Sequence, residues 1–151
     1  MCALLLVAVL WCGCEGGGLN PKNAREAFVG DYTFVSTGDV DLYMGATKVI
    51  TIPMDQKGEM TIALAEKSNA VWIIADNDST LASVSENELF IEPTEEEVTM
   101  AGIDMQMSFT HSKATLVNKQ LSWTSTMDIT ATYRSMSLSG KGQVDIVATR
   151  K

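Results

Sequence analysis

The residue types that catalyse hydrolysis are sparse in this sequence. Its single histidine is His111, and no Gly-x-Ser-x-Gly motif is present. No serine therefore has an evident neighbouring base for nucleophilic catalysis. His111 ends an apolar run that begins at Ile103, where we expect a structural histidine. The acids Glu95 and Glu97 share a strand face, but nothing around them indicates a sugar-binding cleft. The sequence predicts a protein that is not an enzyme.

Metal ligands are also poorly supplied. A zinc site needs several cysteine or histidine ligands, and beyond residue 14 the chain has one histidine and no cysteine. Asp76-Asn77-Asp78-Ser79 carries oxygen ligands suited to calcium but lacks the glycine and the final glutamate of an EF-hand loop. We therefore expect a hairpin turn at this segment, and neither a metal nor a cofactor in the protein.

The three cysteines, Cys2, Cys12 and Cys14, all lie within the first fourteen residues. Ala3 to Trp11 is an uncharged apolar run, which is shorter than the roughly 20 residues that span a bilayer but suits the apolar core of a secretory signal. Glu15 and three glycines follow Cys14 as a flexible polar stretch. We expect the segment before Cys14 to be removed, although it could instead form a buried strand or helix.

Gly13-Cys14 resembles the lipobox of bacterial lipoproteins, in which a signal peptidase cuts before a cysteine that becomes diacylated. Trp11 and Cys12 stand where that family prefers a leucine and a small residue. The resemblance implies a signal peptide over 1–13, a lipidated Cys14, and a tether with a short helical turn over 14–26. Acyl chains such as palmitate would hold the protein on a membrane. We thus expect a lipid-anchored protein of the bacterial cell envelope, on the periplasmic or the surface face of the outer membrane.

Composition and charge restrict the possible partners. The chain has 151 residues, 46% of them hydrophobic, which is typical of one globular domain. Its 19 acids and 11 bases give a net charge of −8, which disfavours nucleic acid and anionic lipid as ligands. Residues 68–112 contain nine acids and no base. The acidic 76–104 region is either a solvated face or a surface for a basic protein partner.

Hydrophobic residues alternate with polar ones over long stretches. From Leu121 to Tyr133 the odd-numbered residues are mostly apolar and the even-numbered ones polar, and the same period of two recurs from Met136 to Ala148 and from Ile103 to Phe109. This period is typical of strands with one buried face. Shorter segments of the same kind occupy 29–37, 40–53, 59–65, 70–76, 81–85 and 88–92.

Turn signals separate these segments at 36–39, 56–59, 76–79, 86–87 and 93–94. Short strands at such spacing predict an all-β fold, either a barrel or a sandwich. Gly102 changes the apolar parity as a bulge or bend in a strand would, and Gly140 with Gly142 marks either a bend or a turn. Asn20 and Pro21 predict one short helical turn before the strands.

Gly30-Asp31-Tyr32 follows the helical turn and opens the series of strands. This order resembles the lipocalin and calycin barrels, and the whole chain resembles the small lipocalin-like lipoproteins of Bacteroidetes. In lipocalins the motif is Gly-x-Trp, with the Trp beneath an Arg from a late strand. The resemblance implies a closed antiparallel up-and-down barrel of about eight strands over 27–151, with a sandwich as the alternative. In this barrel Gly30 and Tyr32 would form the closure motif and Arg134, or alternatively Arg150, would supply the cation.

Methionine is abundant, and several methionines fall on the inward parity of the predicted strands. Flexible thioethers adapt to ligands of varied shape, although they fill ordinary cores equally well. The small inward residues Ser125, Ala131, Gly140 and Gly142 would leave space beside them. We predict noncatalytic binding of a small apolar or amphipathic ligand, and the alternative is a protein-interaction or structural module of an envelope complex that uses the acidic region. The candidate ligand-binding residues are Met105, Met107, Phe109, Trp123, Met127 and Met136.

Overall fold

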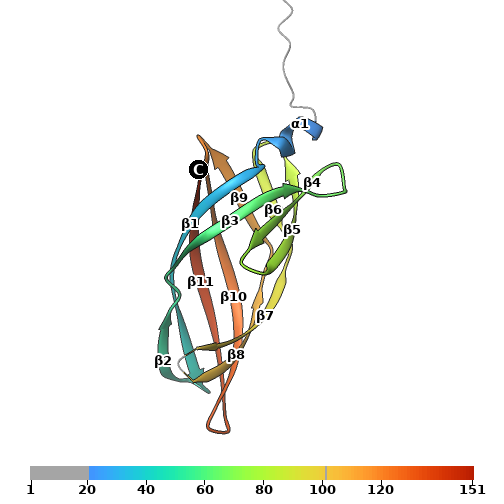
Figure 1. Ribbon diagram of the computed structural model, residues 1–151. Helices are drawn as coiled ribbons and strands as arrows, with labels where there is room; N and C mark the ends of the chain where they lie inside the picture. Colours follow the sequence, from blue (N-terminus) through green and yellow to red (C-terminus); the bar gives the residue numbers. More distant parts are fainter. Residues whose placement is uncertain (1–20, 101) are drawn as a thin grey trace, which may run out of the picture.

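The computed structural model describes residues 21–100 and 102–151, and within them the protein is built from strands with one short helix, α1 (Pro21–Glu26). Figure 1 shows this helix at one end of an elongated barrel. The strands are β1 (Gly30–Met44), β2 (Thr47–Pro53), β3 (Gln56–Leu64), β4 (Ala70–Ala75), β5 (Asp78–Ser85), β6 (Glu88–Ile91), β7 (Thr94–Met100), β8 (Ile103–Phe109), β9 (Ser112–Val117), β10 (Gln120–Tyr133) and β11 (Met136–Arg150).

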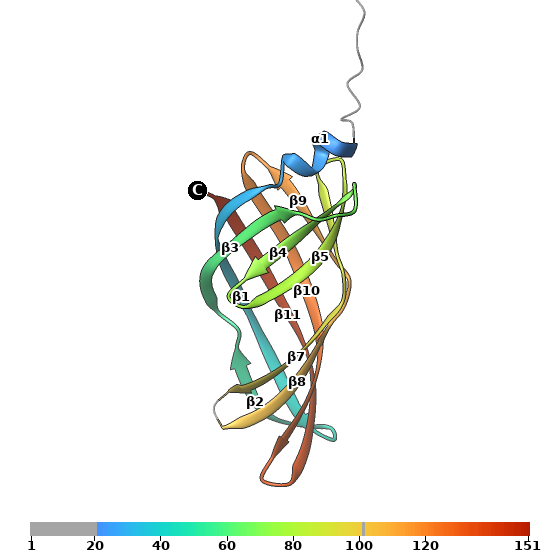
Figure 2. The ribbon, with the colours of Figure 1, turned by 45° about the vertical axis from the view of Figure 1, so that its right-hand side comes forward.

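Eight of the strands close into an antiparallel barrel. They follow the order β11-β1-β3-β4-β5-β6-β9-β10, and β10 pairs back onto β11 to complete the ring (Figure 2). The expectation of a closed barrel with a short helical turn before it is confirmed, and the sandwich alternative is wrong. The architecture is consistent with a calycin-like fold.

Three long strands, β1, β10 and β11, extend beyond this ring. β1 pairs with β3 through Gly30–Ser36 and then with β2 through Asp39–Met44. β10 likewise pairs with β9 through Gln120–Ser122 and with β8 through Met127–Thr132. The half of the molecule next to α1 is therefore a closed ring. The other half, which we call the distal half, is a sheet ordered β2-β1-β11-β10-β8-β7 with β2 and β7 at its edges.

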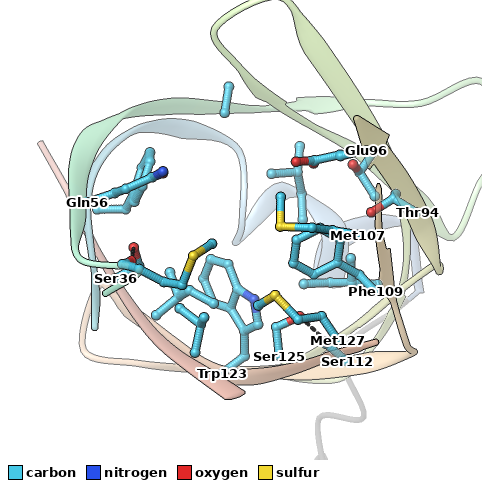
Figure 3. Close-up of a pocket in the computed structure, with 18 of the residues that line it drawn as sticks. Ser36, Gln56, Thr94, Glu96, Met107, Phe109, Ser112, Trp123, Ser125 and Met127 are labelled. Carbon is cyan, nitrogen blue, oxygen red and sulfur yellow. Dashed lines mark hydrogen bonds between the residues drawn. The ribbon is translucent and has the colours of Figure 1, made fainter. Parts of the chain in front are cut away.

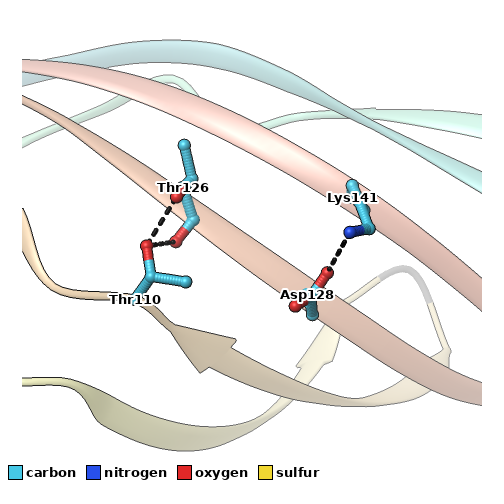
Figure 4. Close-up of polar contacts among 4 residues, drawn as sticks. All are labelled: Thr110, Thr126, Asp128 and Lys141. Atoms are coloured by element: carbon cyan, nitrogen blue, oxygen red, sulfur yellow. Dashed lines mark hydrogen bonds and ion pairs between the residues drawn. The ribbon is translucent and has the colours of Figure 1, made fainter.

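The exchange of partners along β10 occurs at Thr126. The backbone N–H of Thr110, in the link between β8 and β9, donates to the Thr126 carbonyl at 3.0 Å, and the two side-chain oxygens lie 2.6 Å apart. Nearby on the outer face of the sheet, Lys141 Nζ of β11 lies 3.4 Å from Asp128 Oδ1 of β10 (Figure 4). That ion pair is exposed and contributes little, whereas the threonine pair holds the β8–β9 link against β10.

Side chains on the inner face form two separate hydrophobic cores. The helix-side core includes Phe28, Tyr32, Leu89 and Leu121, and the distal core includes Val40, Leu42, Ile103 and Ile129. In β10 the buried residues are odd-numbered and the even-numbered ones are exposed, as the alternation predicts. Strand parity therefore correctly indicated which face of β10 is buried.

The helical turn closes the barrel at its end of the molecule. Ala24 and Phe28 are buried in the helix-side core. Arg25 donates from one guanidinium nitrogen to the carbonyls of Ala65 and Lys67, at 2.9 Å each, and so attaches α1 to the loop between β3 and β4. The helix stabilises the closed end because it both buries apolar surface and satisfies loop carbonyls.

The closure motif uses Arg150 and not Arg134. The Arg150 guanidinium carbon lies 5.4 Å from the centre of the buried Tyr32 ring, and its Nη2 donates to the Tyr32 hydroxyl at 2.8 Å and to the Ala27 carbonyl. Arg134 instead stacks on Tyr133 in the turn between β10 and β11. The choice of Arg134 was wrong because antiparallel pairing places Tyr32 opposite Arg150 and leaves that turn at the far end of β11.

Two segments that composition predicted as turns lie within strands. Residues 36–39 lie within β1, where the absence of a side chain at Gly38 lets the Gln143 carbonyl of β11 approach. Residues 56–59 lie within β3, where Gly58 accommodates the Phe34 ring. Conversely, the segment 40–53 expected as one strand is divided by a turn at Gly45, whose φ is +60°. The turns at 76–77 and 86–87 are confirmed.

The remaining differences concern glycines and one strand. Gly102, with φ +75°, belongs to the hairpin turn between β7 and β8, in which Met100 pairs with Ile103, so the expectation of a bulge or bend within one strand is wrong. β11 continues through Gly140 and Gly142, which excludes a turn there. At Gly140 the Asp41 carbonyl of β1 approaches too closely for any side chain. β9 was not expected as a strand, because its sequence lacks a clear alternation.

Candidate functional site

A cavity of about 300 Å³ lies inside the barrel, between the two hydrophobic cores. Its wall takes residues from the helix-side core, such as Met60, and from the distal core, such as Met127. The cavity occurs at the level where β1 and β10 change partners, because the closed ring ends there and the open sheet begins. Figure 3 shows the labelled side chains surrounding a common space.

The lining of the cavity is mostly apolar, with several sulfur and aromatic groups. Inward parity on the strands supplies these side chains, since residues two apart on a strand point to the same face. Thioethers are flexible and aromatic rings are large and rigid, so the wall combines adaptable with fixed surface. The methionines and aromatic residues that line the cavity are Met54, Met60, Met107, Met127, Phe34, Phe109 and Trp123.

Three buried serines add polar groups to this wall. Ser112 of β9 donates to the Ser125 hydroxyl of β10 at 3.3 Å. Ser36 of β1 donates to the Met54 carbonyl at 3.2 Å. These contacts within the protein satisfy buried hydroxyls that would otherwise be costly to desolvate. They leave the interior mainly apolar, with a few fixed hydrogen-bonding positions.

Two carboxylates complete the wall. Glu96 lies on β7 and Glu92 just after β6, and both line the cavity while remaining open to solvent. Partial burial, reinforced by the negative charge of Asp78, raises the pKa of the Glu96 carboxyl above its ordinary value. Among the described residues that line the cavity, no lysine, arginine or histidine is present. The wall therefore carries negative charge without a compensating cation.

The predicted ligand-binding residues are divided between this cavity and other places. Met107, Phe109, Trp123 and Met127 line the cavity, and their role in binding stays a prediction. Met105 does not line it and packs in the distal core. Met136 begins β11 beside the terminal hairpin turn and is 39% exposed, so it lies outside the barrel interior.

Of the four small residues that were expected to leave space in the barrel, one lines the cavity and three do not. Ser125 lines the cavity. Ala131 is buried in the distal core, and the space beside Gly140 and Gly142 is filled by Leu42 and Val40. These three positions are therefore packed, because the long strands approach each other closely in the distal half.

Sequence reasoning missed several residues of the wall. Phe34, Met54 and Gln56 come from segments whose boundaries were placed wrongly, so their parity was not considered. Glu96 was treated only as part of an acidic face. An available signal was the alternation Thr94, Glu96, Val98, which assigns Glu96 to the inner face of β7.

Other expected features lie elsewhere in the molecule or outside its described part. His111 is exposed, which differs from the structural role expected for it. Across residues 21–100 and 102–151, no group of three or more His, Cys, Asp or Glu residues is arranged to hold a metal. No helix in that part of the chain combines the length and hydropathy needed to cross a membrane. Cys14 and the signal segment lie outside the described residues.

No protein-family model, no curated protein and no solved structure matches this chain.

Proposed function

We propose that the protein is a noncatalytic binder of a small apolar or amphipathic molecule, which it holds in the barrel cavity. The observation that carries the proposal is the 300 Å³ cavity between two packed cores, lined mainly by apolar side chains. Known ligand sites are concave, mostly apolar spaces of about 300 to 1,000 Å³ with a small number of placed polar groups. This cavity is at the lower end of that range, which favours a small ligand.

The lining supports a binding role more than a role in folding stability. Without a ligand, the side chains that line the cavity lack the dispersion contacts that larger side chains would provide there. A ligand would restore those contacts and would bury its own apolar surface, at about 25 cal/mol per Å². The methionines can adjust their rotamers to it, while Trp123 and Phe109 supply fixed surfaces.

A neutral apolar fluorophore, N-phenyl-1-naphthylamine, tests this proposal directly. Titrated into the purified full-length protein, it should bind with one-to-one stoichiometry and gain fluorescence. Ala75→Phe should weaken binding by about tenfold or more, because Ala75 lines the cavity and the larger ring occupies it. Ile74→Phe adds an aromatic ring at the neighbouring residue, which faces outward, and should leave the affinity unchanged.

Saturable binding that both variants retain would place the site outside the cavity. A folded protein that binds no apolar probe would overturn the proposal. The acidic region, in which Glu95 and Glu97 are exposed on β7, would then be the surface to test for a basic protein partner.

We further propose that the barrel is lipid-anchored in a bacterial cell envelope through Cys14. The support is the apolar run before Gly13-Cys14 and the glycine-rich stretch after it, which together suit a cleaved signal and a flexible tether. Diacylation of one cysteine would provide enough buried methylene groups for durable attachment. Such a location would place the binding domain close to amphipathic molecules of the envelope.

A further inference from the structure

The charge on the cavity wall has a single sign. Glu92 and Glu96 are the charged residues among the described side chains that line the cavity, and they come from adjacent segments of the chain. The remaining polar side-chain groups of the wall are hydroxyls, the Gln56 amide and the Trp123 indole N–H. A ligand that enters the cavity therefore meets carboxylates and neutral dipoles, with no cation to accept an anionic group.

Glu96 is directed to the cavity by the geometry of β7. Its strand neighbours Thr94 and Val98 also line the cavity, whereas Glu95 and Glu97 alternate to the other face. In Figure 3 Glu96, Thr94 and Met107 lie on the same side of the cavity, and Glu96 of β7 is paired with Met107 of β8. A polar acceptor thus stands directly beside apolar surface that a ligand chain could cover.

Charged residues around the cavity also favour a cationic ligand over an anionic one. Asp78, which begins β5, is near enough to influence the ionisation of Glu96 and carries the same sign. Residues 68–112, which supply β4 to β8 and therefore this side of the wall, contain nine acids and no base. The potential here repels anions and attracts cations. A cationic partner would also relieve the repulsion between Glu96 and Asp78.

We infer that the ligand is a cationic amphiphile, whose apolar chain lies among the methionine and aromatic side chains while its protonated amine pairs with Glu96, assisted by Glu92. This inference rests on the proposed binding function and adds the class of ligand to it. An ammonium group donates hydrogen bonds to carboxylates, and such charge-assisted bonds are stronger than neutral ones. A carboxylate of the same chain length would meet like charge at the same position.

Three probes of equal chain length separate charge from apolar binding: decylamine, decanol and decanoate. Their affinities for the full-length protein are measured by displacement of N-phenyl-1-naphthylamine at pH about 8, where the amine is protonated and the carboxylates are ionised. We expect decylamine to bind about tenfold more tightly than decanol, and decanoate more weakly than either. Added salt should reduce the preference for decylamine, because screening weakens charge pairing at a partly exposed site.

Substitution of the carboxylates identifies the source of the preference. Glu96→Gln should lower decylamine affinity about fivefold to tenfold and leave decanol affinity within about twofold. Glu92→Gln should act in the same direction with a smaller effect. Glu95→Gln is the matched control, since it removes the same charge from the other face of β7 and should leave the ratio of the two affinities nearly unchanged.

The outcomes distinguish this inference from the function on which it rests. Equal affinity for the amine and the alcohol, or tightest binding of decanoate, would overturn the cationic ligand while leaving an apolar binding site intact. An amine preference that survives both Glu96→Gln and Glu92→Gln would also overturn it. If none of the three probes binds to the folded protein, the proposed binding function fails and the inference fails with it.

Discussion

At the scale of single residues, Tyr32 and Arg150 join the beginning of the barrel to its end. The Tyr32 hydroxyl donates to the Phe28 carbonyl at 2.7 Å and accepts from Arg150 Nε and Nη2, so one buried phenol of β1 links the segment after α1 to β11. The contact combines hydrogen bonds with a cation over an aromatic ring. Because these residues are distant in sequence, the contact stabilises the closed ring and not a local turn.

Arg150→Met should therefore destabilise the protein by about 1 to 2 kcal/mol, because the Tyr32 hydroxyl and the Ala27 carbonyl lose a donor in a partly buried site. Urea unfolding followed by circular dichroism measures the change. Arg134→Met is the matched control: Arg134 contacts Tyr133 at an exposed turn, and its loss should cost under about 0.5 kcal/mol. Equal costs for the two variants would contradict the assignment of Arg150 to the closure.

At the scale of secondary-structure elements, β10 has one face toward the barrel interior and one toward solvent along its fourteen residues. It also contacts both halves, since it pairs with β9, β8 and β11. The distal sheet ends at β7, where Glu95 and Glu97 are exposed. Charged side chains on an edge strand hinder pairing with another chain, so part of the acidic character protects this edge.

Ile129→Asp should unfold the domain or destabilise it by more than about 3 kcal/mol, because Ile129 is 2% exposed and its replacement buries a charge without a partner. Thr130→Asp places the same side chain on the outer face of β10 and should change the free energy of unfolding by under about 1 kcal/mol. Thermal unfolding of the two variants compares them directly. Comparable damage from both would mean that β10 is buried on two faces.

At the scale of the whole molecule, the proposed function combines a binding barrel with a lipid anchor. The barrel supplies an apolar cavity, and the sequence before it carries the features of a cleaved lipoprotein signal. An amphipathic ligand partitions into membranes, so a binder held at the membrane surface would meet a raised local concentration of it. The two proposals are independent, because the first rests on the cavity and the second on the sequence around Cys14.

Cys14→Ser should abolish acyl labelling and move the protein from the membrane fraction to the soluble fraction when it is expressed in a bacterium with lipoprotein processing. Cys12→Ser, two residues away, should leave both labelling and fractionation unchanged, because bulky Trp11 precedes Cys12 and disfavours cleavage there. Metabolic labelling with palmitate and membrane fractionation measure these effects. Continued acylation of the Cys14 variant would exclude Cys14 as the anchor.

The sequence by itself determined the fold class and the buried faces of β10 and β11. The alternation from Leu121 to Tyr133 correctly assigned the inner face of β10, because a strand buried on one side repeats with a period of two whatever its partners are. The same local rule placed Met107 and Met127 on the inner face. It failed near Gly38 and Gly58, which composition marked as turns, because those glycines accommodate neighbouring strands.

Tertiary structure alone decided which inward residues meet at the cavity. Met105 and Met107 share a face of β8 and both belong to the distal core, yet only Met107 also lines the cavity, because its partner Ile129 is nearer than Ala131, the partner of Met105, to the level of Thr126 where the closed ring ends. The choice of Arg150 over Arg134 depended on the register of β1 against β11. The presence of Glu96 beside Met107 likewise follows from the pairing of β7 with β8. Pairing register is a long-range property, and the local period that reveals a strand contains no information about its partner.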